Sequence, residues 1–153
     1  MKEHFITLYH YETWANEAVM DSIVKHAPND QQILRLFSHI LSAQTIWLQR
    51  MSQQPTLQSA WQVLAVEECK LQMQQNHQLL WDFLSNIQDI HQKIFYKNTK
   101  GEEFCNSIYE ILTHLFNHSS YHRGQIVFCL KNYTQDLPVT DIIFYLRKDA
   151  QKA

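Results

Sequence analysis

Glycine and proline are scarce in this chain, whose 153 residues include 2 Gly and 3 Pro. Folds that need many tight turns, such as β-sandwiches, Greek-key barrels and glycine-rich nucleotide-binding units, use far more of both residue types. Long apolar runs are absent as well: the longest, residues 126–130, is far shorter than the roughly 18 residues of a membrane-spanning helix. The composition therefore favours long helices and predicts no membrane span.

An excess of one charge is also missing, because 13 Lys+Arg stand against 15 Asp+Glu. No broad basic surface can form to attract phosphate backbones, so we expect no nucleic-acid partner. The three cysteines, Cys69, Cys105 and Cys129, are isolated and odd in number, which excludes a disulfide framework. Free thiols are typical of a reducing compartment, and the first residues lack an apolar export segment. We expect a cytoplasmic protein.

Hydrophobic periodicity predicts four main helices, since apolar residues recur every three or four positions in four stretches. The first runs from residue 2 to about 26, the second from about 31 to the break near Pro55, and the third from about 57 to 86. The fourth follows Ser107, which has capping-box spacing to Glu110, and continues for about 25 residues.

Shorter elements are expected around the last of these helices. Between Ile90 and Cys105, β-compatible residues flank a turn at Lys100-Gly101, which predicts a small hairpin or ordered crossover. Residues 142–146 predict a short C-terminal helix. The chain should therefore form an all-α protein, a four-helix bundle that occupies residues 1–153 as one domain.

Histidine is abundant, with nine residues, and three of them follow one another at intervals of four on the fourth helix. His114, His118 and His122 therefore lie on successive turns of one face. The outer two are about 12 Å apart along the helix axis and cannot share one ion. When the apolar stripe of this helix faces the core, His122 lies within the stripe, His118 lies at its edge and His114 lies further out. His118 and His122 are therefore the candidate metal ligands on this helix.

A third ligand must come from another helix, and His39 is the best donor. Its neighbours Leu36, Ala43 and Ile46 place it on the apolar flank of the second helix. Three neutral imidazoles with one open position are typical of catalytic divalent-metal sites, where a bound water becomes a nucleophile. Imidazole suits zinc, nickel, iron or copper better than magnesium or calcium. For each histidine the alternative is a core side chain that pairs with a carbonyl or carboxylate.

Other catalytic motifs are excluded by the sequence. Ser119 stands where a His-Glu-x-x-His metalloprotease needs glutamate, and the isolated Gly101 and Gly124 cannot form a serine elbow or a phosphate-binding loop. The catalytic residues stay unknown, because no carboxylate is placed to act as general base. Residues that could contact a substrate or orient a ligand are Asn117, Tyr121 and Gln125.

The remaining polar and aromatic residues have a structural interpretation. The charged side chains scatter over the polar helix faces and are interpreted as solvated surface. The four tryptophans have the spacing of packing residues at the core or its edge: Trp14, Trp47, Trp61 and Trp81.

The fourth helix also carries a recognisable motif. Residues 112–125, LTHLFNHSSYHRGQ, resemble the most distinctive motif of the DinB family. Three further segments agree with this family in the same order: residues 14–16, 37–47 and 98–101. Together these four segments span nearly the whole chain.

The resemblance implies an up-down-down-up four-helix bundle that is usually a homodimer. It also implies that one histidine of the second helix and two of the fourth bind a divalent metal, and these correspond to His39, His118 and His122. The family name records induction by DNA damage in one lineage.

The resemblance does not define a single reaction, because it implies several functions. Some relatives look like metal-dependent transferases that activate a low-molecular-weight thiol, or like thiol-dependent isomerases. We expect a metal-dependent hydrolase or thiol S-transferase that acts on a small molecule, with zinc or nickel, or else iron. The alternatives are a non-catalytic, stress-associated binding protein and a haem or electron-transfer bundle, which would show a Soret band.

Overall fold

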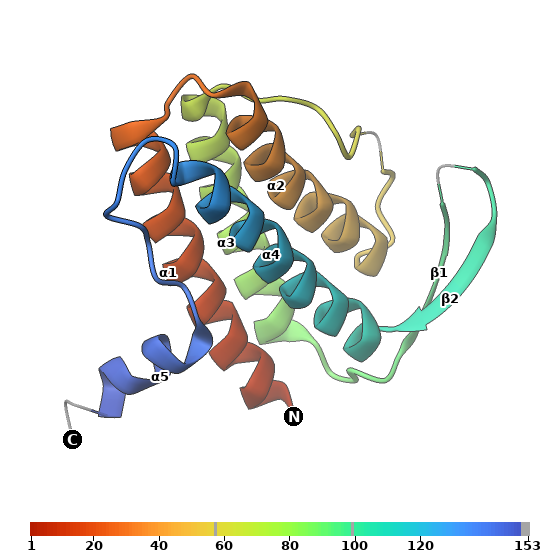
Figure 1. Ribbon diagram of the computed structural model, residues 1–153. Coiled ribbons are helices and arrows are strands. Elements are labelled where there is room, and N and C mark those ends of the chain that lie inside the picture. The colour runs from red at the N-terminus through yellow and green to blue at the C-terminus, as the bar shows by residue number, and fades with distance from the viewer. Residues whose placement is uncertain (57, 99, 151–153) are drawn as a thin grey trace.

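The computed structural model describes residues 1–56, 58–98 and 100–150, and it is mostly helical with one small sheet. Four long helices lie side by side, and a β-hairpin projects from one end of them (Figure 1). The elements of the described residues are α1 (Lys2–His26), α2 (Gln31–Met51), α3 (Val66–Asn86), β1 (Lys93–Lys97), β2 (Glu103–Ser107), α4 (Ile108–Leu130) and α5 (Ile142–Ala150).

Local sequence signals explain where most of these helices begin. The Asp30 carboxylate accepts a hydrogen bond of 2.8 Å from the Ile33 amide and so caps α2. The predicted capping box is present at α4: the Ser107 amide donates to Glu110 over 2.6 Å, and the Glu110 amide donates to the Ser107 hydroxyl over 3.2 Å. The hairpin, the short C-terminal helix and the bounds of α1 are confirmed.

The predicted start of the third helix is wrong. Residues 58–65 form a loop, α3 begins at Val66, and the predicted first residue, Leu57, lies outside the described residues. The loop satisfies its backbone elsewhere, since the Leu64 amide donates to the Ser38 hydroxyl of α2 over 2.9 Å. Glu68 then accepts from the Ala65 amide over 2.8 Å and closes the first turn of α3.

The buried core consists of two apolar clusters. One contains Val19, Ile23, Phe37 and Ile126, and the other contains Phe5, Leu48, Leu84 and Leu112. Each long helix contributes to both clusters. Between its two apolar segments each helix carries buried polar residues, and these side chains meet in a layer: Glu12, Asn16, Gln44, Asn76 and Arg123.

Hydrogen bonds join this polar layer across all four long helices. Arg123 donates to Glu12 over 2.6 Å and to Asn16 over 2.9 Å. Gln44 donates to the other oxygen of Glu12 over 2.7 Å, and Asn76 donates to Gln44 over 3.3 Å. The layer therefore connects α1 directly with α2 and α4, and Gln44 of α2 extends the connection to α3.

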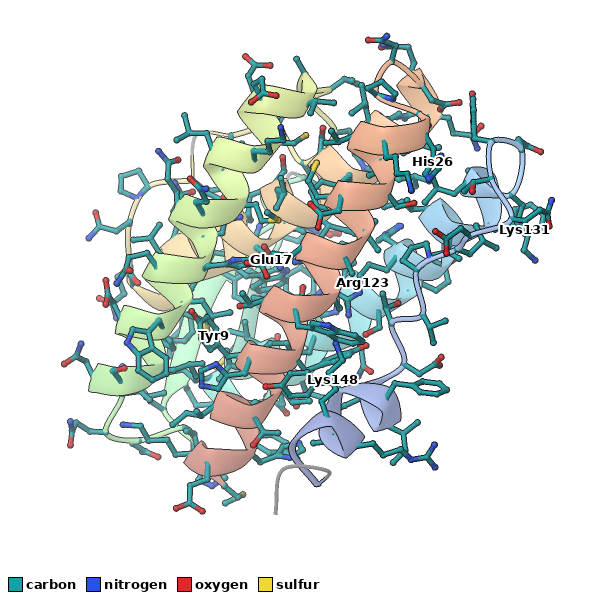
Figure 2. All side chains as sticks on the ribbon, turned by 90° about the vertical axis from the view of Figure 1, so that its left-hand side faces the viewer. Tyr9, Glu17, His26, Arg123, Lys131 and Lys148 are labelled. Atoms are coloured by element: carbon teal, nitrogen blue, oxygen red, sulfur yellow. The ribbon has the colours of Figure 1, made fainter. Side chains whose placement is uncertain are left out.

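The interpretation of all charged residues as solvated surface is wrong for one pair. Glu12 and Arg123 are each 1% exposed and form a buried ion pair. Figure 2 shows Arg123 beside α1. Each side chain lies on the buried side of its helix: Glu12 is seven residues from the buried Phe5 and Val19 on α1, and Arg123 is seven residues from the buried Phe116 on α4. Helical periodicity therefore places both charges at core-facing positions, and only the packing of the helices shows that they pair.

The structure also describes the cysteines and the apolar character of the helices. All three cysteine thiols are free. Among the described helices, none combines the length and the apolar character that a bilayer crossing requires.

Glu12→Ala should strongly destabilise the fold, because it leaves the Arg123 guanidinium buried without its partner. Breaking a buried pair in this way costs about 3–5 kcal/mol of unfolding free energy, which urea denaturation measures. Glu17→Ala is the matched control, since Glu17 is exposed on the same helix. Equal stability of the two variants would contradict a structural role for the ion pair.

Candidate metal centre

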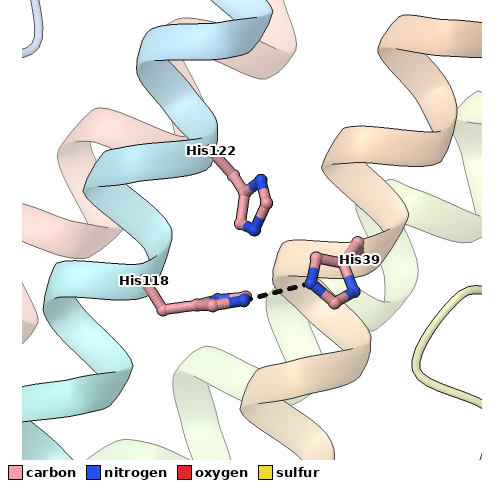
Figure 3. A group of neighbouring side chains, drawn as sticks. All are labelled: His39, His118 and His122. Carbon is pink, nitrogen blue, oxygen red and sulfur yellow. Dashed lines mark hydrogen bonds between the residues drawn. The ribbon is translucent and has the colours of Figure 1, made fainter.

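The three predicted histidines converge between α2 and α4 (Figure 3). One ring nitrogen from each of His39, His118 and His122 lies within 4.8 Å of the others. The closest pair is Nε2 of His118 and Nε2 of His39, at 3.1 Å. His39 is 7% and His122 8% exposed, and His118 is half-buried. The structure therefore brings together the three side chains that the sequence selected.

Helix geometry and packing explain this convergence. His118 and His122 are one turn apart on α4, so both rings extend toward the same neighbour, α2. Their next residues, Ser119 and Arg123, are buried in the polar layer. Because Arg123 is bound to α1, the rotation of α4 is fixed, and the histidine side faces α2.

Hydrogen bonds hold two of the rings in a defined orientation. Nδ1–H of His39 donates to the Ala60 carbonyl oxygen over 2.7 Å. Nδ1–H of His122 donates to the amide oxygen of Gln125 over 2.7 Å. Each partner fixes the tautomer, so that the Nε2 lone pair is left for the cluster, an arrangement common among metal-binding histidines.

Burial favours the uncharged form of His39 and His118. Burial, together with electrostatic repulsion from the adjacent imidazoles, lowers the pKa of His118 to about 4. Burial also lowers the pKa of His39. Since Nε2 of His39 has no proton, His118 donates its Nε2–H to it in the metal-free protein. Neutral imidazole is the form that binds a metal ion.

The donor set fits a divalent transition metal. Two nitrogens bound to one ion at about 2.0–2.1 Å cannot be more than about 4.2 Å apart, so small ring rotations suffice to close the cluster on an ion. Among the described residues, no carboxylate bonds to any of the three rings. An all-nitrogen set of neutral donors suits zinc or nickel better than magnesium or calcium.

Trp61 contributes to the site although the sequence analysis assigned it to helix packing. It lies in the loop before α3, is 47% exposed, and stacks on the His39 ring with centroids 3.5 Å apart and an interplanar angle of 2°. The Arg35 guanidinium also lies over the Trp61 ring, at 5.0 Å. Because this segment was predicted as helix, the sequence had no signal for the stack.

The other predicted residues lie at different distances from the cluster. Gln125 bonds to His122, and the exposed Tyr121 ring lies 5.0 Å from the His122 ring. His114 is exposed, with its ring 5.4 Å from that of His118. Asn117 is not at the cluster: it lines a pocket between α1 and α4 together with residues such as Phe5.

Fold and site together define a helical protein with a three-histidine cluster between two long helices. The chain matches the DinB family over residues 1–153 and belongs to this family. It is 24% identical to Protein DinB of Bacillus subtilis (strain 168) over 168 aligned positions, which cover 95% of each chain. No solved structure matches the chain.

Gln125→Ala should weaken metal binding about ten- to a hundredfold, because His122 loses the group that fixes its tautomer. Titration with zinc against a competing chelator measures the affinity. Asn117→Ala is the matched control, since Asn117 lies on the same helix but outside the cluster. If both variants bind zinc as tightly as the parent protein, Gln125 does not orient the ligand.

Proposed function

We propose that this DinB-family chain binds one divalent metal ion through His39, His118 and His122, and that the metal is zinc or nickel. The observation that carries the proposal is the approach of three imidazole ring nitrogens to within 4.8 Å from two different helices. The match to the DinB family over the whole chain supports it.

The proposed activity is that of a metal-dependent enzyme, either a hydrolase or a thiol S-transferase. A divalent ion bound there would act as a Lewis acid that lowers the pKa of a water or thiol and so supplies a nucleophile near neutral pH. The protein would hold the ion with neutral donors, so the full positive charge of the metal would act on that nucleophile. A non-catalytic binding protein is the alternative.

The surrounding residues would orient the ligands and restrict access. Ala60 and Gln125 hold the Nδ1 sides of two rings, which leaves the Nε2 sides toward the ion. Trp61 covers one face of His39 and excludes water from it. An incoming small molecule would therefore approach past His118, the least buried of the three histidines.

The architecture and assembly proposed with this function follow the family resemblance. We propose the up-down-down-up arrangement of the four long helices and a homodimer. Exposed apolar side chains on α4 and α5, among them Phe128 at 70% and Ile143 at 47% exposure, would supply apolar surface for a second copy. Cytoplasmic location and induction by DNA damage are part of the same proposal.

His118→Ala should reduce the bound metal from about one ion per chain to nearly none, because two histidines rarely retain a divalent ion through purification. Elemental analysis of protein prepared without a histidine tag measures this stoichiometry. His114→Ala, one turn away on the same helix, should keep the full metal content. An unchanged metal content per chain in His118→Ala would contradict the proposed site.

A thiol-conjugation assay with model electrophiles distinguishes the two enzyme classes from a binding protein. Conjugation that disappears after chelation and in His118→Ala would support the S-transferase. Hydrolysis of model esters that disappears under the same two conditions would support the hydrolase. Activity that survives complete chelation would contradict both metal-dependent reactions.

A further inference from the structure

Arg50 occupies the same face of α2 as His39. The two residues are eleven positions apart, which is about 1,100° of rotation, so their directions differ by about 20° and their positions by about 16 Å along the axis. Arg50 is in the last turn of α2, next to the hairpin. One helix face therefore carries a proposed metal ligand at one point and a guanidinium three turns later.

A continuous strip of side chains connects these two points. Ala43 and Ile46 lie on the same helix face between them and are 9% and 8% exposed. Beside them, ring centroids follow one another at short distances, from His118 to His114 at 5.4 Å, from His114 to Trp47 at 5.4 Å, and from Trp47 to Tyr96 at 5.0 Å.

Two aromatic rings hold the Arg50 guanidinium in place. Its carbon lies 4.6 Å from the Trp47 centroid and 4.7 Å from the Tyr96 centroid. It donates to the Lys97 carbonyl oxygen over 3.2 Å. These contacts fix the position of the cation and leave other N–H groups of its planar fork available for an anion.

Arg50 has no anionic partner of its own. Across residues 1–56, 58–98 and 100–148, no carboxylate lies within ion-pair distance of it. The two lysines nearby differ, since Lys97 pairs with Glu103 at 3.2 Å and Lys93 with Glu110 at 3.7 Å. Partial burial lowers the pKa of Arg50.

The guanidinium lines an open pocket of about 440 Å³ between the end of α2 and strand β1. The pocket walls are polar and cationic rather than acidic, and they include Gln53, Gln54, Thr56 and Lys93. A fixed guanidinium matches the geometry of carboxylate and phosphate oxygens. The chemistry of this pocket is therefore that of an anion site.

We propose that the Arg50 pocket binds the carboxylate or phosphate group of the ligand whose other end reaches the three-histidine cluster. The ligand is thus an elongated, anionic small molecule that lies along the strip between α2 and α4. The link to the cluster rests on the proposed function, whereas anion binding in the pocket stands independently of it.

Anion binding is tested on metal-free protein by NMR titration with inorganic phosphate and, separately, with succinate. Signals of the Trp47 indole N–H and the Tyr96 amide should shift in a saturable manner with at least one of the two anions, and the anion that binds more tightly identifies the group. Arg50→Gln should weaken this binding at least tenfold. Arg147→Gln should leave it unchanged, because Arg147 also lies over a ring, that of Phe144, but outside the pocket.

A second variant covers the case in which Arg50→Gln fails to fold. Gln53 is exposed in the same pocket, so Gln53→Glu adds a carboxylate without disturbing the core and should also weaken anion binding at least tenfold. No saturable shift in the parent protein, or equal affinity in the folded variants, overturns the anion site.

The connection to the metal centre is tested on cobalt-loaded protein with two thiols of the same length. The near-ultraviolet thiolate-to-cobalt band should appear at concentrations at least tenfold lower for ω-mercaptoundecanoate than for the uncharged ω-mercaptoundecanol, and Arg50→Gln should abolish this preference. Equal affinities for the two thiols overturn the connection. Failure to load cobalt overturns the proposed function instead and leaves the phosphate result unaffected.

Discussion

The buried ion pair between Glu12 and Arg123 is the constraint on which the arrangement of the helices depends. Apolar burial is non-directional and does not by itself define one pairing of residues, whereas a buried charge that loses its partner costs several kcal/mol. A shift of α4 by one turn against α1 would separate this pair. Because Glu12 also accepts from Gln44 of α2, the same constraint fixes α2 relative to α4. The position of the histidine cluster between these two helices follows from it.

The three-histidine cluster is built with neutral partners. A backbone carbonyl and a side-chain amide orient His39 and His122, where many metal sites use carboxylates. Burial and repulsion from the neighbouring rings hold the pKa of His118 at about 4, so this ring is uncharged at neutral pH. The loop before α3 contributes through Ala60 and Trp61, and this loop separates the otherwise regular helices α2 and α3.

Helix α2 combines two kinds of chemistry on one face. His39 belongs to the cluster that the DinB family resemblance implies, while Arg50 lies three turns away at the hairpin. The Ala60 carbonyl and the Trp61 ring hold the first residue, and the contacts with Trp47 and Tyr96 hold the second. In this proposal the metal held by the histidines activates the reactive atom at one end of the ligand. The pocket at the hairpin selects the ligand by the anionic group at its other end.

The sequence by itself determined the local features, because periodicity, caps and turns depend on neighbours a few residues away. It indicated the extent of α1 and α4, the hairpin and the candidate cluster of His39, His118 and His122. The spacing of four on α4 left two adjacent histidine pairs, and the apolar stripe favoured His118 and His122. It misplaced the start of α3, because the apolar residues of the preceding loop imitate a helical pattern. Only the tertiary structure decided that Glu12 and Arg123 form an ion pair, that Trp61 covers His39, and that the rings converge. These relations join residues far apart in the chain, and no local pattern encodes the rotation of one helix against another.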